Sequence, residues 1–213
     1  MKNSLLILLL LTIAISGYSQ KKEMLFNGKN LDGWTIYCSD SKVSPRSYFY
    51  VKDGVIETVG VPNGYLRTKK EYSNYQLHVE WRWTENPTNS GIFVHVNGPD
   101  KMLPAHYQYQ LKAGDAGDIV LHGVGETLTV RDTIFTSSEK VKPLIRKSMP
   151  SSEKKPGEWN SADITCKGNT IIFKVNGVVQ NQATKCSLTK GEIGLQAEGS
   201  KIQFRNLWVE EIK

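Results

Sequence analysis

Cysteine is scarce in this sequence, with three residues among 213: Cys38, Cys166 and Cys186. The chain has no CxxC motif and no Cys/His spacing typical of a structural metal ion, which argues against a zinc site built on thiolates. In an exported protein, an odd count leaves at least one thiol free or bonded to another molecule. Cys166 and Cys186 can pair only if their strands are neighbours.

Long hydrophobic runs are also missing, apart from Leu5 to Ile15 near the start. This run is shorter than the roughly 20 residues that span a bilayer. Lys2 precedes it and small residues follow it, which predicts a secretory signal peptide over residues 1–20. No Cys follows at the position where a bacterial lipoprotein is acylated. We therefore expect an exported protein, periplasmic or secreted, without stable membrane insertion after cleavage; the alternative is an uncleaved membrane anchor.

Residues 21–213 contain no amphipathic helical stretch longer than two turns and no internal repeat. Helical bundles and solenoids are excluded on this ground. The region instead holds about a dozen short strand-like stretches separated by turn residues. Asp53-Gly54 and Asn176-Gly177 are dipeptides favoured in tight hairpins. We therefore expect one all-β domain, a sandwich or barrel, whose first and last strands pair if it is a jelly roll.

A strong charge of one sign is absent. The chain has 27 Lys and Arg against 21 Asp and Glu, a formal net charge of +6, and removal of Lys2 leaves +5. The lysines are scattered and not interleaved with aromatic residues, which favours a solvated surface over nucleic-acid binding. The Gly-rich segment 113–118 (AGDAGD) lacks the Lys-Ser/Thr that follows a phosphate-binding loop, and its acids would repel phosphate.

The clearest pattern lies in residues 75–96. Apolar and polar residues alternate over 75–83, which predicts a half-buried strand. The polar connection 84–90 is too long for a two-residue turn, and 91–96 is then a returning strand. One face of this predicted hairpin buries two Trp side chains. The other face carries Glu80, Arg82 and His95.

Two other predicted strands repeat the polar face, one with Gln108 and Gln110, the other with Gln196 and Glu198. The simplest interpretation is that these are solvated faces of antiparallel sheets, with Glu80 paired to a nearby cation. However, Gln recurs where solvated strands usually carry Lys, Thr and Glu. Amides, carboxylates and aromatic rings together are suited to bind sugar hydroxyls and to stack on sugar rings. The pattern therefore favours a carbohydrate-binding surface.

Several segments occur in an order that resembles a known family. They are LFNGKNLDGW (25–34), EYSNYQLHVEWRW (71–83), NSGIFVH (89–95), YQYQ (107–110), GEWN (157–160), NGVV (176–179) and IGLQAEGSKIQFRNLWVEEI (193–212). In this combination, residues 25–212 resemble the 3-keto-disaccharide hydrolase domain family. The resemblance implies a concanavalin A-like jelly-roll β-sandwich. The Ser-Gln at the end of the predicted signal peptide is similar to those of Bacteroidetes proteins.

The resemblance also implies an enzyme acting on small oxidised glycosides. A ketone at C3 acidifies the proton at C2, so a base can remove that proton and the aglycone leaves C1 by β-elimination, with water added later. Glu80 is the first choice for acid/base work, and His95 is a second candidate. The implied substrate contacts are Arg82, Asn89, Gln108, Gln110, Trp159, Gln196 and Glu198.

The chain departs from the family pattern at Gln108, where many members carry Glu, so the second catalytic group is unassigned. Asp115 or Asp118 in segment 113–118 can supply acids instead, or oxygen ligands for a divalent cation such as Ca²⁺, unless the loop is simply solvated. No other cofactor is indicated.

Two other functions fit the predicted fold. A non-catalytic carbohydrate-binding sandwich is one, because a fold does not establish a function. A retaining endoglucanase is the other, but it needs two carboxyl groups roughly 5 to 5.5 Å apart. Its closely spaced Glu-x-Asp-x-x-Glu acids are absent from the sequence. The sequence leaves open whether Glu80, Arg82, Gln110 and Gln196 share one concave face.

Overall fold

The computed structural model describes residues 21–212, so the predicted signal peptide lies outside the described residues. The elements follow in this order: β1 (Glu23–Met24), β2 (Trp34–Cys38), α1 (Pro45–Tyr48), β3 (Phe49–Lys52), β4 (Val55–Thr58), β5 (Gly64–Thr68), β6 (Tyr75–Trp83), β7 (Gly91–Asn97), β8 (Ala105–Gln110), β9 (Ile119–His122), β10 (Thr127–Val130), β11 (Thr133–Thr136), β12 (Leu144–Ile145), β13 (Asn160–Lys167), β14 (Thr170–Val175), β15 (Val178–Ala183), β16 (Glu192–Ala197) and β17 (Ile202–Glu211).

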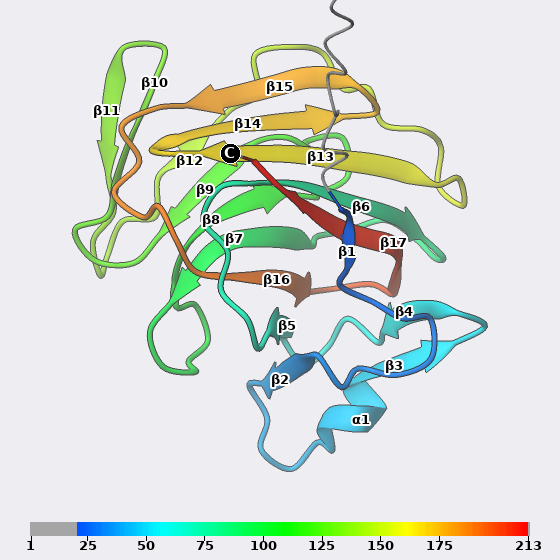
Figure 1. Ribbon diagram of the computed structural model, residues 1–213. Coiled ribbons are helices and arrows are strands. Elements are labelled where there is room, and N and C mark those ends of the chain that lie inside the picture. Colours follow the sequence, from blue (N-terminus) through cyan, green and yellow to red (C-terminus); the bar gives the residue numbers. More distant parts are fainter. Residues whose placement is uncertain (1–20, 213) are drawn as a thin grey trace, which may run out of the picture.

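Two antiparallel sheets pack face to face (Figure 1). The first, here called the β6 sheet, has the order β15–β14–β13–β6–β17–β4–β3, with β1 paired to β17. The second, the β8 sheet, has the order β12–β9–β8–β7–β16–β5–β2. The edge strands β2 and β3 lie near α1 at the same end of the molecule (Figure 1). The predicted all-β sandwich is thus confirmed.

The core lies between the sheets and takes one face of each strand. On β6, alternate residues from Tyr75 to Trp81 are fully buried, while the residues between them are only half-buried. On β8, Tyr107 and Tyr109 are fully buried in the core. Because successive side chains of a strand point to opposite faces, the polar residues of each strand lie on the outer face of its own sheet.

Both predicted tight hairpins are present. Asp53-Gly54 joins β3 to β4, and Asn176-Gly177 joins β14 to β15. All four residues have positive φ, at 50° and 76° in the first turn and 48° and 81° in the second. Type I′ turns need this conformation, whose twist matches that of the flanking strands. The expected pairing of the chain ends also occurs, between β1 and β17.

The predicted hairpin over 75–96 is wrong. β6 pairs with β13 and β17, whereas β7 pairs with β8 and β16, so the two strands belong to different sheets. Residues 84–90 therefore cross from one sheet to the other, and they are fixed there by the Ser90 hydroxyl, which donates to the Gln196 carbonyl at 2.8 Å. The alternation of β6 was interpreted correctly, but alternation does not encode which strand is the neighbour.

Three further features complete the description of the fold. β10 and β11 form a separate hairpin, which turns at Arg131 and Asp132, both with positive φ. The mostly exposed segment 137–156, here called the surface excursion, contains only the two-residue strand β12. Cys166 and Cys186 are both buried, and no disulfide joins them.

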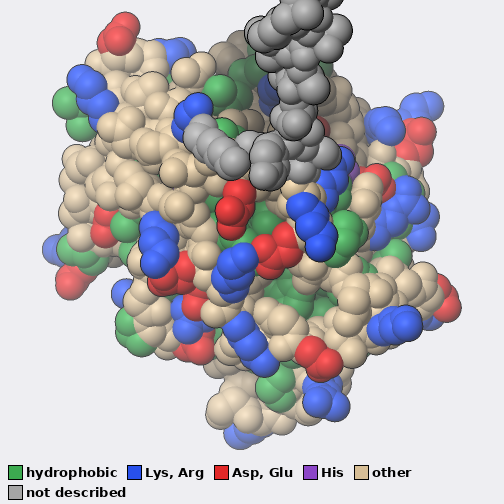
Figure 2. All heavy atoms as spheres, in the orientation of Figure 1, with side chains coloured by type: hydrophobic (Ala, Val, Ile, Leu, Met, Phe, Trp, Pro, Cys, Tyr) green, Lys and Arg blue, Asp and Glu red, His purple; other side chains and the backbone are tan. Residues whose placement is uncertain are grey.

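The described residues also bear on surface charge and membrane spanning. On the face shown in Figure 2, Lys and Arg side chains are interspersed with Asp and Glu. Within residues 21–212, no helix is long and apolar enough to cross a membrane.

Candidate functional site

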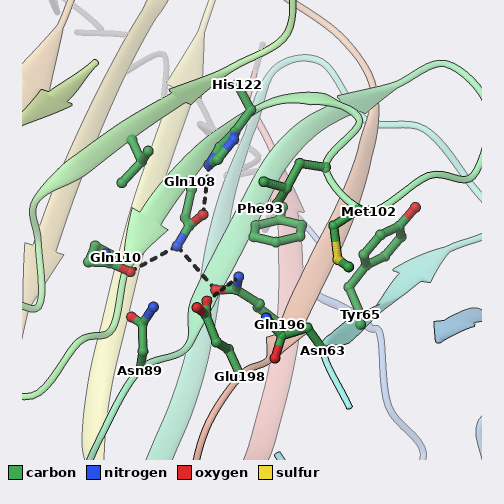
Figure 3. A pocket seen from close by; sticks show the side chains of 13 residues that line it. Asn63, Tyr65, Asn89, Phe93, Met102, Gln108, Gln110, His122, Gln196 and Glu198 are labelled. Carbon is green, nitrogen blue, oxygen red and sulfur yellow. Dashed lines mark hydrogen bonds between the residues drawn. The ribbon is translucent and has the colours of Figure 1, made fainter. Parts of the chain in front are cut away.

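A hollow of about 230 Å³ opens on the outer face of the β8 sheet (Figure 3). Its polar lining comprises Asn63, Asn89, Gln108, Gln110, His122, Gln196 and Glu198. Its other lining residues include Tyr65, Phe93, Met102, Leu103 and Val120. The structure therefore brings together five of the predicted substrate contacts, namely Asn89, Gln108, Gln110, Gln196 and Glu198.

Strand alternation explains why these side chains meet. Gln108 and Gln110 lie on the outer face of β8 because Tyr107 and Tyr109 fill the core. Gln196 comes from β16, which is separated from β8 by β7 alone. Residues from two distant parts of the chain are thus placed side by side by the strand order.

Hydrogen bonds link these side chains into one chain across three strands (Figure 3). The Gln108 Nε2 group donates to Gln110 Oε1 at 2.8 Å and to Gln196 Oε1 at 3.1 Å. The Gln196 Nε2 group donates to Glu198 Oε2 at 2.8 Å. At the other end, His122 Nε2 lies 3.0 Å from Gln108 Oε1. We call this set the amide relay: His122, Gln108, Gln110, Gln196 and Glu198.

A pair of buried histidines supports the relay from one side. The rings of His106 and His122 stack with centroids 4.4 Å apart, and His106 Nδ1 lies 2.8 Å from the Pro104 carbonyl oxygen. Burial, with Lys142 acting in the same direction, lowers the pKa of His122 to about 4. Burial and the neighbouring His122 also lower the pKa of His106 well below its ordinary value. Both imidazoles are therefore neutral at pH 7.

An aromatic wall faces the amides across the hollow (Figure 3). Tyr65 stacks on Tyr37 at 5.0 Å and meets Phe93 edge-on at 5.8 Å. The Tyr65 hydroxyl lies 3.1 Å from both Asp100 Oδ1 and the Lys101 carbonyl oxygen, so its one O–H donor is already engaged. The hollow thus has one polar and one apolar side, which suits a sugar ring.

Glu80, Arg82 and Trp159 lie elsewhere, on the outer face of the β6 sheet. Trp159 packs against two guanidinium groups, with Arg82 at 4.6 Å and Arg205 at 4.0 Å from its ring centroid. Glu80 accepts hydrogen bonds from Arg205 at 2.6 Å and from Asn206 at 3.0 Å. The single shared face that the sequence left open is therefore not formed: the predicted residues divide between opposite outer faces of the sandwich.

The environment of Glu80 is that of a paired surface carboxylate. Burial raises the pKa of Glu80, but the hydrogen bonds from Asn206 and Arg205 outweigh it and hold the pKa below its ordinary value. Such a group is a weak base. This geometry matches the simplest interpretation of Glu80, a charge paired with a cation of the neighbouring strand.

The expectation that His95 lies on a polar outer face is wrong. His95 has φ 54° at an irregularity in the β7–β8 pairing, and its side chain is buried. Its ring meets Tyr75 of β6 and Tyr107 of β8 edge-on, so it lies between the sheets. The Nδ1 atom is 3.0 Å from the Leu188 carbonyl oxygen. The local change in strand register turns the His95 side chain into the core, although simple alternation assigned it to the outer face.

The acids of segment 113–118 are engaged by cations. Asp118 is fully buried and accepts from Arg146 Nη1 at 2.9 Å and from the Lys147 backbone N–H at 2.8 Å. Asp115 forms ion pairs with Lys112 and Arg146, each at 3.2 Å. These contacts occupy the oxygens that were candidates for binding a divalent cation. Across residues 21–212, no group of three or more His, Cys, Asp or Glu side chains is arranged to hold a metal ion.

Sequence reasoning missed the aromatic wall and His122. The signal for His122 was present, since Ile119 and Leu121 alternate with Val120 and His122, which places His122 on the outer face. The sequence did not indicate that β8 pairs with β9. This pairing sets Gln108 opposite Val120 and brings His122 within hydrogen-bond distance of Gln108.

Comparisons with known proteins agree with this fold. The chain matches the profile of the 3-keto-alpha-glucoside-1,2-lyase-like domain over residues 21–210. No curated protein matches it by sequence. Two crystal structures of proteins from Parabacteroides distasonis ATCC 8503, provisionally described as glycosyl hydrolases, are 23% and 24% identical, with TM-scores of 0.64 and 0.65. Each aligns with 90% of this chain, over 94% and 100% of its own length.

More distant structures share the architecture. The carbohydrate-binding module CBM66 from Bacillus subtilis is 10% identical with a TM-score of 0.61, covering 89% of this chain and 100% of its own. A beta-glucanase from Bacillus licheniformis is 12% identical with a TM-score of 0.57, covering 91% and 98%. These likenesses show a concanavalin A-like β-sandwich, and the profile match over nearly the whole chain shows the family. The chain belongs to the 3-keto-alpha-glucoside-1,2-lyase-like domain family and is a carbohydrate-active protein.

Proposed function

We propose that the hollow binds one ring of a 3-keto-glucoside and that the protein cleaves this ring from its aglycone by β-elimination. One observation carries the proposal: among the described residues that line the hollow, Glu198 is the one carboxylate, and its polar neighbours are neutral amides and a neutral His. Ordinary glycosidases use two carboxyl groups, roughly 5 to 9.5 Å apart. Elimination beside a ketone needs one base and hydrogen-bond donors for the oxygen that gains charge.

The proposed reaction balances with Glu198 as the single acid/base group. Its carboxylate takes the proton from C2, and the electrons of that C–H bond move onto the C3 oxygen as an enolate. The C3 carbonyl then re-forms, the double bond C1=C2 forms, and the C1–O bond to the aglycone breaks. The protonated Glu198 returns the proton to the leaving oxygen, so the carboxylate is regenerated.

The size and lining of the hollow support a single sugar ring as the bound unit. Its volume of about 230 Å³ is below the roughly 300 to 1,000 Å³ of pockets for drug-sized ligands. Met102 and Leu103, backed by the buried rings of Tyr65 and Phe93, offer an apolar surface for the ring, and the amides face its oxygens. The aglycone would then project from the open side. We propose in addition that the protein acts after export, on the basis of the signal-peptide pattern in residues 1–20.

Turnover of a 3-keto-α-glucoside, compared with that of the unoxidised glucoside, tests this function. We expect release of the aglycone only from the oxidised sugar. Glu198→Gln should lower kcat by about 100-fold or more, because it removes the proposed base. Glu80→Gln should leave kcat unchanged, because Glu80 lies on the opposite outer face. If Glu80→Gln removes activity while Glu198→Gln keeps it, the assignment of the site to this hollow is wrong.

A carbohydrate-binding module is the second candidate, and Gln108 is the observation that favours it. An amide occupies the centre of the relay, at the position where the family resemblance implies Glu. Binding of the oxidised sugar without release of the aglycone would support this second function.

A further inference from the structure

The hydrogen bonds of the amide relay have one permitted direction. An ionised carboxylate only accepts hydrogen bonds, so the Gln196 atom that lies 2.8 Å from Glu198 is the NH₂ group. Gln196 therefore turns its carbonyl oxygen toward Gln108. The Gln108 atom that lies 3.1 Å from this oxygen must in turn be its NH₂ group.

The same reasoning fixes both remaining ends of the relay. The Gln108 NH₂ group also donates to Gln110, so Gln110 presents its oxygen to Gln108 and keeps its own NH₂ group free. The Gln108 oxygen faces His122, which must therefore carry its proton on Nε2. One charge, on Glu198, thus orients three amides and selects one tautomer of His122.

Counting the amide N–H groups of the relay identifies the donors that remain for a ligand. Both N–H groups of Gln108 are used inside the relay, and Gln196 uses one on Glu198. Within the described residues, the Gln110 NH₂ group has no protein partner, and its side chain lines the hollow. Asn89 also lines the hollow, but no described side-chain hydrogen bond fixes which end of its amide points inward. Gln110 is therefore the relay amide whose whole NH₂ group is free, while Gln196 keeps one free N–H.

We propose that Gln110 determines specificity for a ketone over a hydroxyl at C3 of the bound sugar. The inference rests on the proposed function of the hollow and adds the residue that recognises the oxidised carbon. A ketone oxygen only accepts, so it pairs with the Gln110 NH₂ group without leaving a hydrogen unpaired. A hydroxyl brings one hydrogen of its own, for which the Gln110 NH₂ group offers no acceptor. An unpaired buried donor disfavours that ligand.

The test uses sugars that lack an aglycone, so that binding is measured without cleavage. Titration calorimetry compares 1,5-anhydro-3-keto-glucitol with 1,5-anhydroglucitol. The unmodified protein should prefer the ketone by about tenfold or more, and Gln110→Glu should abolish or reverse that preference, since its second oxygen accepts where the amide donated. An unchanged preference in Gln110→Glu overturns the proposal. So does equal binding, or no binding, of the two sugars by the unmodified protein.

Two further variants separate the loss of the Gln110 NH₂ group from the effect of an added negative charge. Gln182→Glu makes the same chemical change at an exposed position of β15 and should keep the ketone preference. Gln110→Met removes the NH₂ group without adding charge. It should lose the preference without reversing it, and it serves as the test if Gln110→Glu fails to fold.

The direction of the hydrogen bonds in the amide relay can be tested without a ligand, from the tautomer of His122. In protein labelled with ¹⁵N-histidine at pH 7, the His122 signals should show the tautomer protonated at Nε2. A proton on Nδ1 overturns the relay and with it the role of Gln110. Failure of the proposed cleavage looks different: the ketone is preferred and His122 has the expected tautomer, but no aglycone is released from a 3-keto-glucoside.

Discussion

At the scale of single residues, Gly91 is important for the site because it has no Cβ atom and leaves room for the Gln108 side chain. It follows Ser90 on the crossing segment and pairs with Gln110 in the β7–β8 ladder. A Cβ atom at this position would lie 2.8 Å from both Cγ and Nε2 of Gln108. Glycine is therefore needed because the Gln108 side chain crosses directly over its backbone.

Gly91→Ala should consequently disturb ligand binding more than folding. The added methyl group displaces Gln108, so affinity for 1,5-anhydro-3-keto-glucitol should fall about tenfold as relay hydrogen bonds are lost. The free energy of unfolding should change by no more than about 1 kcal/mol, because alanine also restricts the unfolded chain. Calorimetry and urea unfolding measure the two effects. Unchanged affinity together with a large loss of stability would contradict the described packing of Gln108.

At the scale of elements, the turn between β14 and β15 does more than reverse the chain. Asn176 adopts φ 48°, and its side chain also links the turn to the surface excursion 137–156. Its Nδ2 group donates to the Ser152 carbonyl and to Asn160 Oδ1, both at 2.8 Å, and its Oδ1 accepts from the Ser161 backbone N–H at 2.8 Å. The dipeptide Asn176-Gly177 indicated the hairpin, but it did not indicate these tertiary contacts of the Asn176 side chain.

Asn176→Ala should lower the free energy of unfolding by about 2 to 4 kcal/mol, from the loss of three hydrogen bonds and from strain at positive φ. Asn176→Gly relieves the strain and should cost less. Asp53→Ala is the matched control, because Asp53 has φ 50° in the same turn position and no side-chain hydrogen bond within the described residues. Urea denaturation measures all three. Equal losses for Asn176→Ala and Asp53→Ala would show that the extra contacts contribute nothing.

At the scale of the whole molecule, buried histidines link folding to pH. Burial lowers the pKa of His95, His106 and His122, so the unfolded chain binds protons more readily than the folded one. Stability from these groups is complete above the unfolded value of 6.5 and is lost as the pH falls below it. For His122, with a folded pKa of about 4, the full contribution is about 3 kcal/mol.

We therefore expect the free energy of unfolding to fall steadily from pH 7 toward pH 4. Denaturation curves at several pH values measure it, and His122→Gln should give a shallower dependence than the unmodified protein. The carboxylates with lowered pKa values, such as Glu80, add a further loss at lower pH, since stability tied to a lowered carboxyl pKa disappears as that group is protonated. A free energy that stays constant between pH 7 and 5 would contradict the burial of these histidines.

The sequence by itself determined which side chains of a strand share a face. Alternation assigned Tyr107 and Tyr109 to the core and Gln108 and Gln110 to the outside, and the dipeptide Asn176-Gly177 marked its hairpin. These features are local, because they follow from the two-residue period of a strand and from the φ values that a turn requires.

Only the tertiary structure decided which of these faces meet. Glu80 and Gln110 have the same local pattern, yet they lie on opposite outer faces because β6 and β8 belong to different sheets. His95 turned inward at a change of strand register, and His122 joined the relay through the pairing of β8 with β9. Strand order and register depend on contacts between segments far apart in the chain, and a two-residue period carries no information about them.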